Sequence, residues 1–260
     1  MQNVNSIKSA YIKEMLNNGI RAERGLLDFR GINISRDIIP NAEGSAEVNL
    51  GSTKVLAGLK IDVDEPMPDK PDEGNLIISA ELLPLASADY DTGPPSPEAI
   101  ELARVVDRGI RAANVVDPKS LFISEGKVWS IFIDIYIMNY DGNLFDASSL
   151  AAVAALTNAR MPKYEDEKVI REGKLSKLKT SNIVTSCTYA KIGNKIVLDP
   201  NGSEESVMES RITIANDENI IRAMQKGLSG AFSENEITDL VNTTFEKSKS
   251  LRSIINKLSD

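Results

Sequence analysis

The sequence predicts a protein of the α+β or mixed α/β class, with two lobes built from related halves. In each half, a series of short strand-like segments is followed by a helix-like segment. A polar, lysine-rich stretch separates the two series and is the best linker candidate in the chain. We therefore divide the chain into an N-terminal helix at residues 1–20, a first half at 21–160, a linker at 161–182 and a second half at 183–260.

A predicted helix at residues 6–17 precedes the first half, and Gly19 follows as its C-terminal cap. Alternating apolar residues predict a strand at 30–36. Two further strands, 46–50 and 54–63, flank a turn at Gly51 and Ser52. The proline-rich residues 65–74 form a loop, and residues 75–85 are predicted to form the next strand.

A helix follows this series of strands. Ser96 is suited to cap it, and Pro97 suits its first position. Residues 128–138 supply another strand. Asp146 is then predicted to cap a short alanine-rich helix that runs to about residue 158.

The second half begins with a hairpin. Residues 183–191 and 195–198 are its predicted strands, joined across Gly193 and Asn194. Residues 211–215 alternate as a strand, with residues 220–224 as a candidate partner. Ser233 and Glu236 then form a capping box that opens a long C-terminal helix. Its apolar stripe is mostly expected to face the core: Ile237, Leu240, Val241, Phe245, Leu251, Ile255 and Leu258.

The composition excludes several classes of function. The 260 residues contain no histidine, which removes Ser-His-Asp and Cys-His catalysis and every histidine-ligated metal site. Cys187 is the one cysteine, so an internal disulfide cannot form, and its apolar neighbours favour a buried structural thiol. The net charge of −8 argues against indiscriminate binding of polyanions. Contact with nucleic acid would therefore need a local basic patch or a partner chain.

No segment is apolar for long enough to span a bilayer, and the N-terminus is too polar for a secretory signal. We therefore expect a soluble, cytoplasmic protein without membrane contact.

Three arginines stand out on the helix after Ser96. Arg104, Arg108 and Arg111 lie at i, i+4 and i+7, within a stripe about 60° wide that borders the apolar face. One interpretation is a row of ion pairs with Glu101 and Asp107. The other is contact with phosphate groups or an RNA backbone, which suits the planar guanidinium group.

A second candidate site lies in residues 199–212, DPNGSEESVMESRI, where four carboxylates fall within eleven residues. A calcium-loop interpretation fails on spacing. Glu204 stands where a glycine should bend such a loop, and Ser210 stands where a bidentate acid should be. The residues alone leave two interpretations, a solvated acidic turn and a magnesium site.

Four segments carry a family resemblance: GSAEVNLGSTKVLAGLK, ELLPLAS, GPPSPEAIELARVVDRGIR and DIYIMNYDGNLFDASSLAAVAAL. In this order they resemble the ribonuclease PH superfamily, and within it the non-catalytic ribonuclease PH-like subunit of the archaeal exosome core. The resemblance implies a two-lobed β-α-β fold and a hexameric ring of three heterodimers. In such rings the alternate subunit is catalytic and degrades RNA from the 3′ end with phosphate as the nucleophile. RNA-binding cap subunits are implied as further partners.

Phosphorolysis needs a cradle for inorganic phosphate. Catalytic members of the superfamily build it from an Asp-Gly-type turn followed by a Thr-Arg or Ser-Arg pair. This chain keeps Asp141 and Gly142 but carries Leu144 and Phe145 at the positions of that pair. Apolar side chains cannot bind a dianion, so the resemblance implies a degenerate phosphate site.

The reaction also needs carboxylates that place a divalent metal ion. Catalytic members carry three aspartates spaced six residues apart, and the matching positions here are Asp199, Glu205 and Arg211. An arginine repels a metal ion, so this site is also expected to be a remnant. The chain departs again at Ala22, Glu23 and Arg24, where family members often read Asp-Gly-Arg, while Arg30 is kept.

The resemblance therefore implies a non-catalytic ring subunit with no cofactor and no metal. It would structure the active site of its partner and help to bind RNA through Arg104, Arg108 and Arg111. Two alternatives stay open: a catalytically competent phosphorolytic exoribonuclease, and a structural ring subunit without RNA contact.

Overall fold

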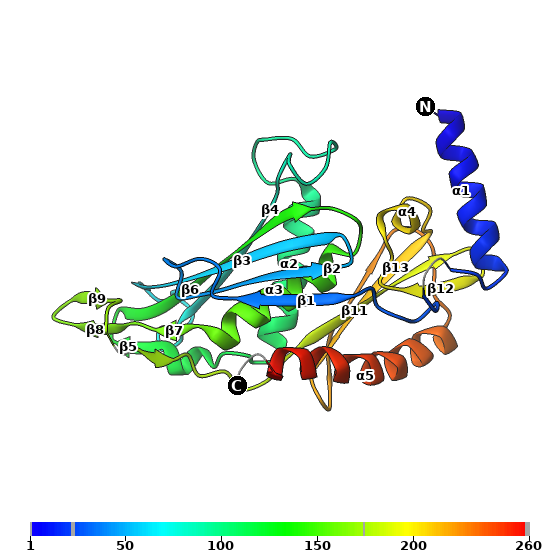
Figure 1. The fold of residues 1–260 in the computed structure, drawn as a ribbon. Helices are drawn as coiled ribbons and strands as arrows, with labels where there is room; N and C mark the ends of the chain where they lie inside the picture. Colours follow the sequence, from blue (N-terminus) through cyan, green and yellow to red (C-terminus); the bar gives the residue numbers. More distant parts are fainter. Residues whose placement is uncertain (1, 22–23, 174, 258–260) are drawn as a thin grey trace.

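Six strands of the first half form one sheet in the computed structural model, which describes residues 2–21, 24–173 and 175–257 (Figure 1). The sheet order is β1-β2-β3-β6-β4, and β5 pairs with β6. The strands are β1 (Ile32–Arg36), β2 (Gly44–Leu50), β3 (Thr53–Asp64), β4 (Asn75–Leu82), β5 (Phe122–Ser124) and β6 (Lys127–Asn139). The predicted turn at Gly51 joins β2 to β3, and its φ of +58° is one that glycine adopts without strain.

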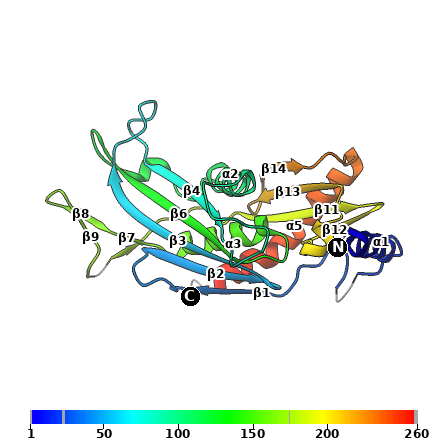
Figure 2. The same ribbon diagram turned by 90° about the horizontal axis from the view of Figure 1, so that it is seen from above.

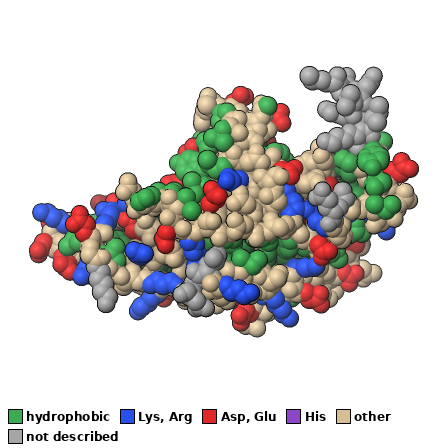
Figure 3. All heavy atoms as spheres, in the orientation of Figure 1, with side chains coloured by type: hydrophobic (Ala, Val, Ile, Leu, Met, Phe, Trp, Pro, Cys, Tyr) green, Lys and Arg blue, Asp and Glu red, His purple; other side chains and the backbone are tan. Residues whose placement is uncertain are grey.

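One pair in this sheet, β4 with β6, is parallel, while the others are antiparallel. A parallel pair needs a long crossover, and here it contains helix α2 (Pro97–Ala112) and the short 3₁₀ helix η1 (Pro118–Leu121). Ser96 caps α2 as predicted, because its Oγ accepts a hydrogen bond of 3.2 Å from the Ala99 amide. The loop that enters α2, residues 83–96, carries a cluster of apolar side chains on its surface, including Leu85 at 64% exposure (Figure 3).

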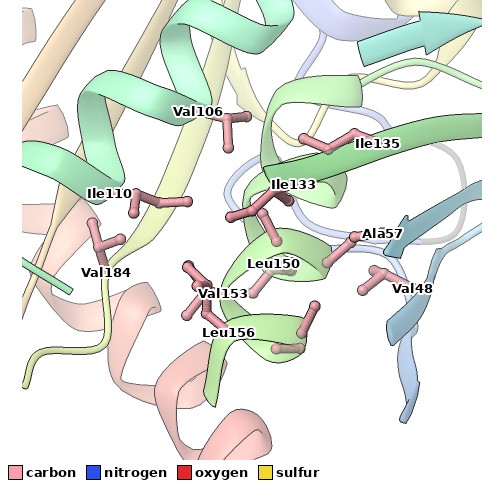
Figure 4. Packing of buried hydrophobic residues seen from close by; sticks show 14 of the residues in the cluster. Val48, Ala57, Val106, Ile110, Ile133, Ile135, Leu150, Val153, Leu156 and Val184 are labelled. Atoms are coloured by element: carbon pink, nitrogen blue, oxygen red, sulfur yellow. The ribbon is translucent and has the colours of Figure 1, made fainter. Parts of the chain in front are cut away.

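Helix α3 (Leu144–Asn158) is buried along nearly its whole length. It packs against β2 and β3 of the first sheet and against β11 of the second half (Figure 2). Its small alanine side chains let both layers approach closely, while the larger Leu150, Val153 and Leu156 fill the space between β6, α2 and Val184 (Figure 4). The two halves therefore share one continuous hydrophobic core.

The predicted cap of α3 is wrong. Asn143, with a left-handed φ of 53°, holds the N-cap position, and its side-chain oxygen accepts from the Asp146 amide. Asp146 lies within the first turn and is fully buried. The sequence pattern failed here because only asparagine and few other residues tolerate this left-handed backbone, and Asn143 combines that conformation with the cap.

The second half forms a four-stranded antiparallel sheet of order β12-β11-β13-β14. Its strands are β11 (Thr185–Ile192), β12 (Lys195–Leu198), β13 (Ser210–Asn216) and β14 (Ile221–Gly227). The short helix α4 (Gly202–Glu205) lies between β12 and β13, and α5 (Glu234–Lys257) packs against β11 and β13. The predicted hairpin and the fold class, α+β in two lobes, are confirmed. Cys187 is buried, as expected.

The residues between the halves hold short strands: β7 (Arg160–Met161), β8 (Lys163–Glu165), β9 (Lys168–Ile170) and β10 (Ser176–Lys177). Strands β8 and β9 form a hairpin at one end of the molecule (Figure 1), within the predicted linker. At the opposite end stands α1 (Gln2–Asn17), which Gly19 terminates with a φ of +73°.

Helix α5 brings the end of the chain back to its beginning. Arg36 of β1 donates to the Ile255 carbonyl at 3.1 Å, and Lys247 pairs with Asp28 at 2.8 Å. The predicted capping box forms, since the Ser233 amide donates to Glu236 and the Glu236 amide donates back to Ser233. Of its predicted apolar stripe, Leu240, Leu251 and Ile255 are buried, and Leu258 lies outside the described residues.

Candidate functional site

The two segments that the sequence singled out meet between the lobes. Asp199 follows β12 with a left-handed φ of 55°. Across from it, the loop that leads from β6 into α3 presents Asp141, Gly142 and Asn143. The two backbones touch at Gly142, where a Cβ would lie within 2.5 Å of the Pro200 carbonyl oxygen. Only glycine fits this approach, so the Asp-Gly turn serves as a close contact between the lobes.

Asp199 is fully buried, and protein donors occupy both of its carboxylate oxygens. Oδ2 accepts from the backbone amide of Arg30 at 2.8 Å and from its Nε at 2.9 Å. Oδ1 accepts from Arg30 Nη2 at 2.8 Å and from Asn143 Nδ2 at 2.7 Å. Burial opposes the charged form of Arg30, yet its hydrogen bond and charge interaction with Asp199 raise its pKa. Asp199 is therefore part of an ion pair and is not an open metal ligand.

Glu205 is engaged in the same way. One oxygen accepts from the Tyr140 hydroxyl at 2.6 Å, and the other accepts from the backbone amide of Asn143 at 2.8 Å. Burial raises the pKa of Glu205, although these hydrogen bonds and the nearby Arg211 favour its charged form. This carboxylate therefore also binds protein groups.

Arg211 and Phe145 contact each other directly. The guanidinium carbon of Arg211 lies 4.1 Å from the centroid of the Phe145 ring, which is a cation–π distance. Arg211 Nη2 also donates to Glu101 at 2.6 Å. The residue at the third predicted metal position thus stacks on a residue at a predicted phosphate position. Leu144 precedes Phe145 and is partly buried against the core.

Asn143 joins these parts together. Its side-chain nitrogen Nδ2 donates to Asp146 at 2.8 Å and to Asp199 at 2.7 Å. Asp146 in turn accepts from the amide and the hydroxyl of Thr188 on β11. Burial raises the pKa of Asp146 to about 7, despite these hydrogen bonds.

The sequence did not reveal a second layer of arginines at this site. Arg21 donates from Nε and Nη2 to the two oxygens of Glu204, each at 2.8 Å. Arg24 donates to the Asp199 carbonyl at 2.7 Å, while Ala22 and Glu23 of the same motif lie outside the described residues. The basic residues before β1 were visible in the sequence, but nothing in their spacing indicated partners 175 and 183 residues away.

The arginines of α2 lie on the surface, and the structure separates their roles. Arg111 Nε donates to both carboxylate oxygens of Asp107, and its Nη2 donates to the Leu76 carbonyl. Arg108 donates to Gln225 of β14 at 2.8 Å. Arg104 is exposed and has no hydrogen-bond or ion-pair partner in the described part of the chain. The ion-pair interpretation thus holds for Asp107 and fails for Glu101, which binds Arg211.

The described residues show no group of three or more Cys, Asp or Glu side chains that could hold a metal ion. Within the same ranges, none of the helices is both long and apolar enough to cross a membrane.

Comparison with known proteins identifies the family. The model of the 3′ exoribonuclease family, domain 1, matches residues 28–162, and that of domain 2 matches residues 182–247. The chain belongs to the 3′ exoribonuclease family. The family models are those of ribonuclease PH, so the predicted resemblance is confirmed.

Members of this family from archaea are similar over nearly the whole chain. The exosome complex component Rrp42 of Thermococcus gammatolerans is 45% identical over 251 residues, covering 94% of this chain and 92% of the relative. That of Thermoplasma acidophilum is 44% identical, with 96% and 95% covered.

Solved structures agree. A chain of the Archaeoglobus fulgidus exosome with RNA bound to the active site has a TM-score of 0.91 and 41% identity, covering 96% of this chain and 98% of that one. A chain of an archaeal exosome core has a TM-score of 0.88 and 38% identity, with 98% and 100% covered.

Proposed function

We propose that this chain is a non-catalytic subunit of an exosome of the archaeal type. It alternates with a catalytic ribonuclease PH-like subunit in a hexameric ring of three heterodimers, carries RNA-binding cap subunits and works in the cytoplasm. Its task is to structure the active site of the partner and to help bind RNA for 3′-to-5′ phosphorolysis. The archaeal relatives named as exosome components, which match it over nearly their whole length, support this assignment.

The contact between Arg211 and Phe145 is the observation that carries the non-catalytic part of the proposal. Phosphorolysis requires an open cationic cradle for phosphate and free carboxylates for a metal ion. Here the phosphate position holds an aromatic ring, and the metal position holds a cation stacked on that ring. Asp199 and Glu205 already accept hydrogen bonds from Arg30, Asn143 and Tyr140.

The α2 arginines are the residues through which this chain would contact RNA. Arg104 and Arg108 are the better candidates, because Arg104 has no partner in the described residues and Arg108 is held only by a neutral amide. Arg111 is expected to contribute less, since its charge is already balanced by Asp107.

The test is reconstitution with the catalytic ribonuclease PH-like subunit of the same organism. The release of nucleoside diphosphates from a single-stranded RNA would be measured with phosphate, for each subunit alone and for the complex. We expect phosphate-dependent decay by the complex and none by this chain alone. The chain with Arg211→Met added to the complex serves as a control, because methionine removes the charge without placing another carboxylate beside Glu101 and Glu205, and it should leave assembly-dependent decay in place.

Other outcomes would decide for the alternatives. Release of nucleoside diphosphates by this chain alone would favour a competent enzyme. The proposal would be contradicted if the catalytic subunit degraded RNA as fast, and bound RNA with the same affinity, without this chain as with it. Crosslinking of RNA to the assembled ring separates the RNA-binding subunit from the structural one, since only the former should give crosslinks on α2.

A further inference from the structure

Arg252 lies near the end of α5, beside the turn between β13 and β14 and the segment that leads into β11. The residue is 6% exposed, and its Nη1 is enclosed without a hydrogen-bond partner. In the described residues Arg252 forms no hydrogen bond and no ion pair. A buried guanidinium without a partner is costly, because it has lost its water and gained nothing in exchange.

The carboxylates nearby do not satisfy this side chain. Asp217 accepts from the amides of Asn219 and Ile220 and from Arg222 Nε at 2.6 Å, so its oxygens are already bound. Glu218 is exposed and attracts Arg252 through charge alone. Burial therefore dominates and lowers the pKa of Arg252.

Two open pockets meet at Arg252. One of about 540 Å³ lies along the last turns of α5, and one of about 350 Å³ reaches the segment before β11. They share Glu218, Asn219, Arg252 and Asn256. Three further side chains of α5 that can donate hydrogen bonds line the first pocket: Lys249, Ser253 and Lys257.

We propose that this pocket binds a phosphate group, with Arg252 as its central ligand. A tetrahedral phosphate offers acceptor oxygens in several directions, and the donors around Arg252 come from α5, from the β13–β14 turn and from residues 181–182. A carboxylate offers two coplanar oxygens and would leave part of this set unused. Among the described residues that line the first pocket, Glu218 carries the one negative charge, while Lys249, Arg252 and Lys257 carry three positive charges.

The phosphate can belong to free inorganic phosphate or to an RNA backbone. The chemistry of recognition is the same in both cases. The pocket-lining residues include neither Asp199, Glu205 and Arg211 nor the arginines of α2. The inference does not depend on assembly into a ring. The isolated chain is therefore used in the experiment, because a catalytic partner would bring a phosphate site of its own.

The experiment compares the wild type with Arg252→Met and with Lys163→Met. Lys163 is an exposed residue of β8, so its variant removes the same charge outside the pocket. Thermal unfolding would be followed against inorganic phosphate at constant ionic strength. A fluorescent single-stranded RNA would be titrated in parallel by anisotropy, with and without phosphate.

We expect phosphate to raise the melting temperature of the wild type and of Lys163→Met but not of Arg252→Met, whose phosphate affinity should fall about tenfold or more. Without phosphate, Arg252→Met should be at least as stable as the wild type, because it removes an unpaired buried charge. If RNA binding depends on Arg252 and phosphate competes with it, the bound phosphate group belongs to the RNA backbone. Binding of phosphate alone would identify the free ion.

Three results would overturn the inference. The first is a wild-type protein whose melting temperature phosphate does not raise and whose binding of RNA does not depend on Arg252. The second is an Arg252→Met variant that responds to phosphate as the wild type does. The third is an Arg252→Met variant that unfolds in phosphate-free buffer, because the guanidinium would then have a structural partner inside the protein.

Discussion

The Asp199 carboxylate accepts four hydrogen bonds inside the protein, three from Arg30 and one from Asn143. A carboxylate so completely bound cannot also bind a metal ion without losing some of them. At the scale of the single residue, the acidic loop is therefore a set of ion pairs that fasten one lobe to the other.

Replacing Arg30 by methionine should expose how much this pairing contributes. The variant leaves the buried Asp199 with Arg24, 3.7 Å away, as its remaining cation, and removing one member of a buried ion pair costs about 3–5 kcal/mol. Urea unfolding would measure the loss. The exposed Lys163→Met variant should stay within about 0.5 kcal/mol of the wild type, and an Arg30→Met protein of equal stability would show that Arg24 and Asn143 are enough to hold Asp199.

Asp146 should make stability depend on pH. Its pKa is raised from an ordinary value of 3.8 to about 7 by burial, so the folded state keeps a proton that the unfolded chain releases. The folded state then binds more protons between these two pH values. The free energy of unfolding must therefore fall as pH rises through this window and level off above it.

Asp146→Asn removes this titration. Unfolding in urea would be measured for both proteins across the same pH range. As pH rises from 4 to 7, the unfolding free energy of the wild type should fall relative to that of the variant. A difference that is constant over the range would mean that Asp146 stays ionised in the folded protein, held by Thr188 and Asn143.

Arg211→Asp places a carboxylate at the third predicted metal position, yet we do not expect a metal site to follow. Asp199 and Glu205 keep their protein donors, and a divalent ion would have to displace Arg30 and Tyr140. Magnesium should therefore leave the melting temperature of this variant unchanged. A magnesium-dependent rise that the wild type lacks would show that Arg211 alone blocks the site.

Between elements, the decisive contact is the one between the β6–α3 loop and the chain before α4. Gly142 adopts a φ of +78° there, and the atoms of Pro200, Asn201 and Gly202 leave no space for a side chain. The loop that would build a phosphate cradle thus packs directly on the loop that would hold the metal.

Gly142→Ala should be markedly destabilising, and Gly126→Ala is its matched control. Gly126 has a similar φ of +73°, but a Cβ there would meet nothing within 4 Å. Both variants carry the strain of a left-handed alanine, about 1 kcal/mol. Only Gly142→Ala adds the overlap with backbone atoms, so it should lose clearly more stability in urea unfolding. Equal losses of unfolding free energy in the two variants would mean that the backbone at residues 200–202 can move away from an alanine at position 142 at little cost.

On α2, the three arginines should differ in their effect on RNA binding by the assembled ring. Arg104→Gln and Arg108→Gln should each weaken binding and reduce the slope of log affinity against log salt by about 1. Arg111→Gln should have a smaller effect, because Asp107 already balances its charge. Lys163→Gln is the control, and equal effects from all four variants would contradict a specific contact on α2.

Across the whole molecule, the sequence predicted the order of elements well, because strands such as β3 alternate between buried and exposed residues and α2 carries its own cap. The family resemblance also singled out the two segments that meet between the lobes. The sequence missed the layer of Arg21 and Glu204, and it misassigned the cap of α3, because these depend on contacts between residues far apart in the chain and on the left-handed backbone at Asn143.

The return of α5 to β1 has a consequence for synthesis of the protein on the ribosome. Arg36 binds the Ile255 carbonyl and Asp28 binds Lys247, so each residue made early waits for a partner 219 positions later in the chain. Until β11 has been made, the face of α3 that packs against it lacks its cover, and β11 in turn lacks α5. We therefore expect the nascent chain to keep an exposed apolar surface until α5 leaves the exit tunnel, which makes that stage the one most in need of a chaperone.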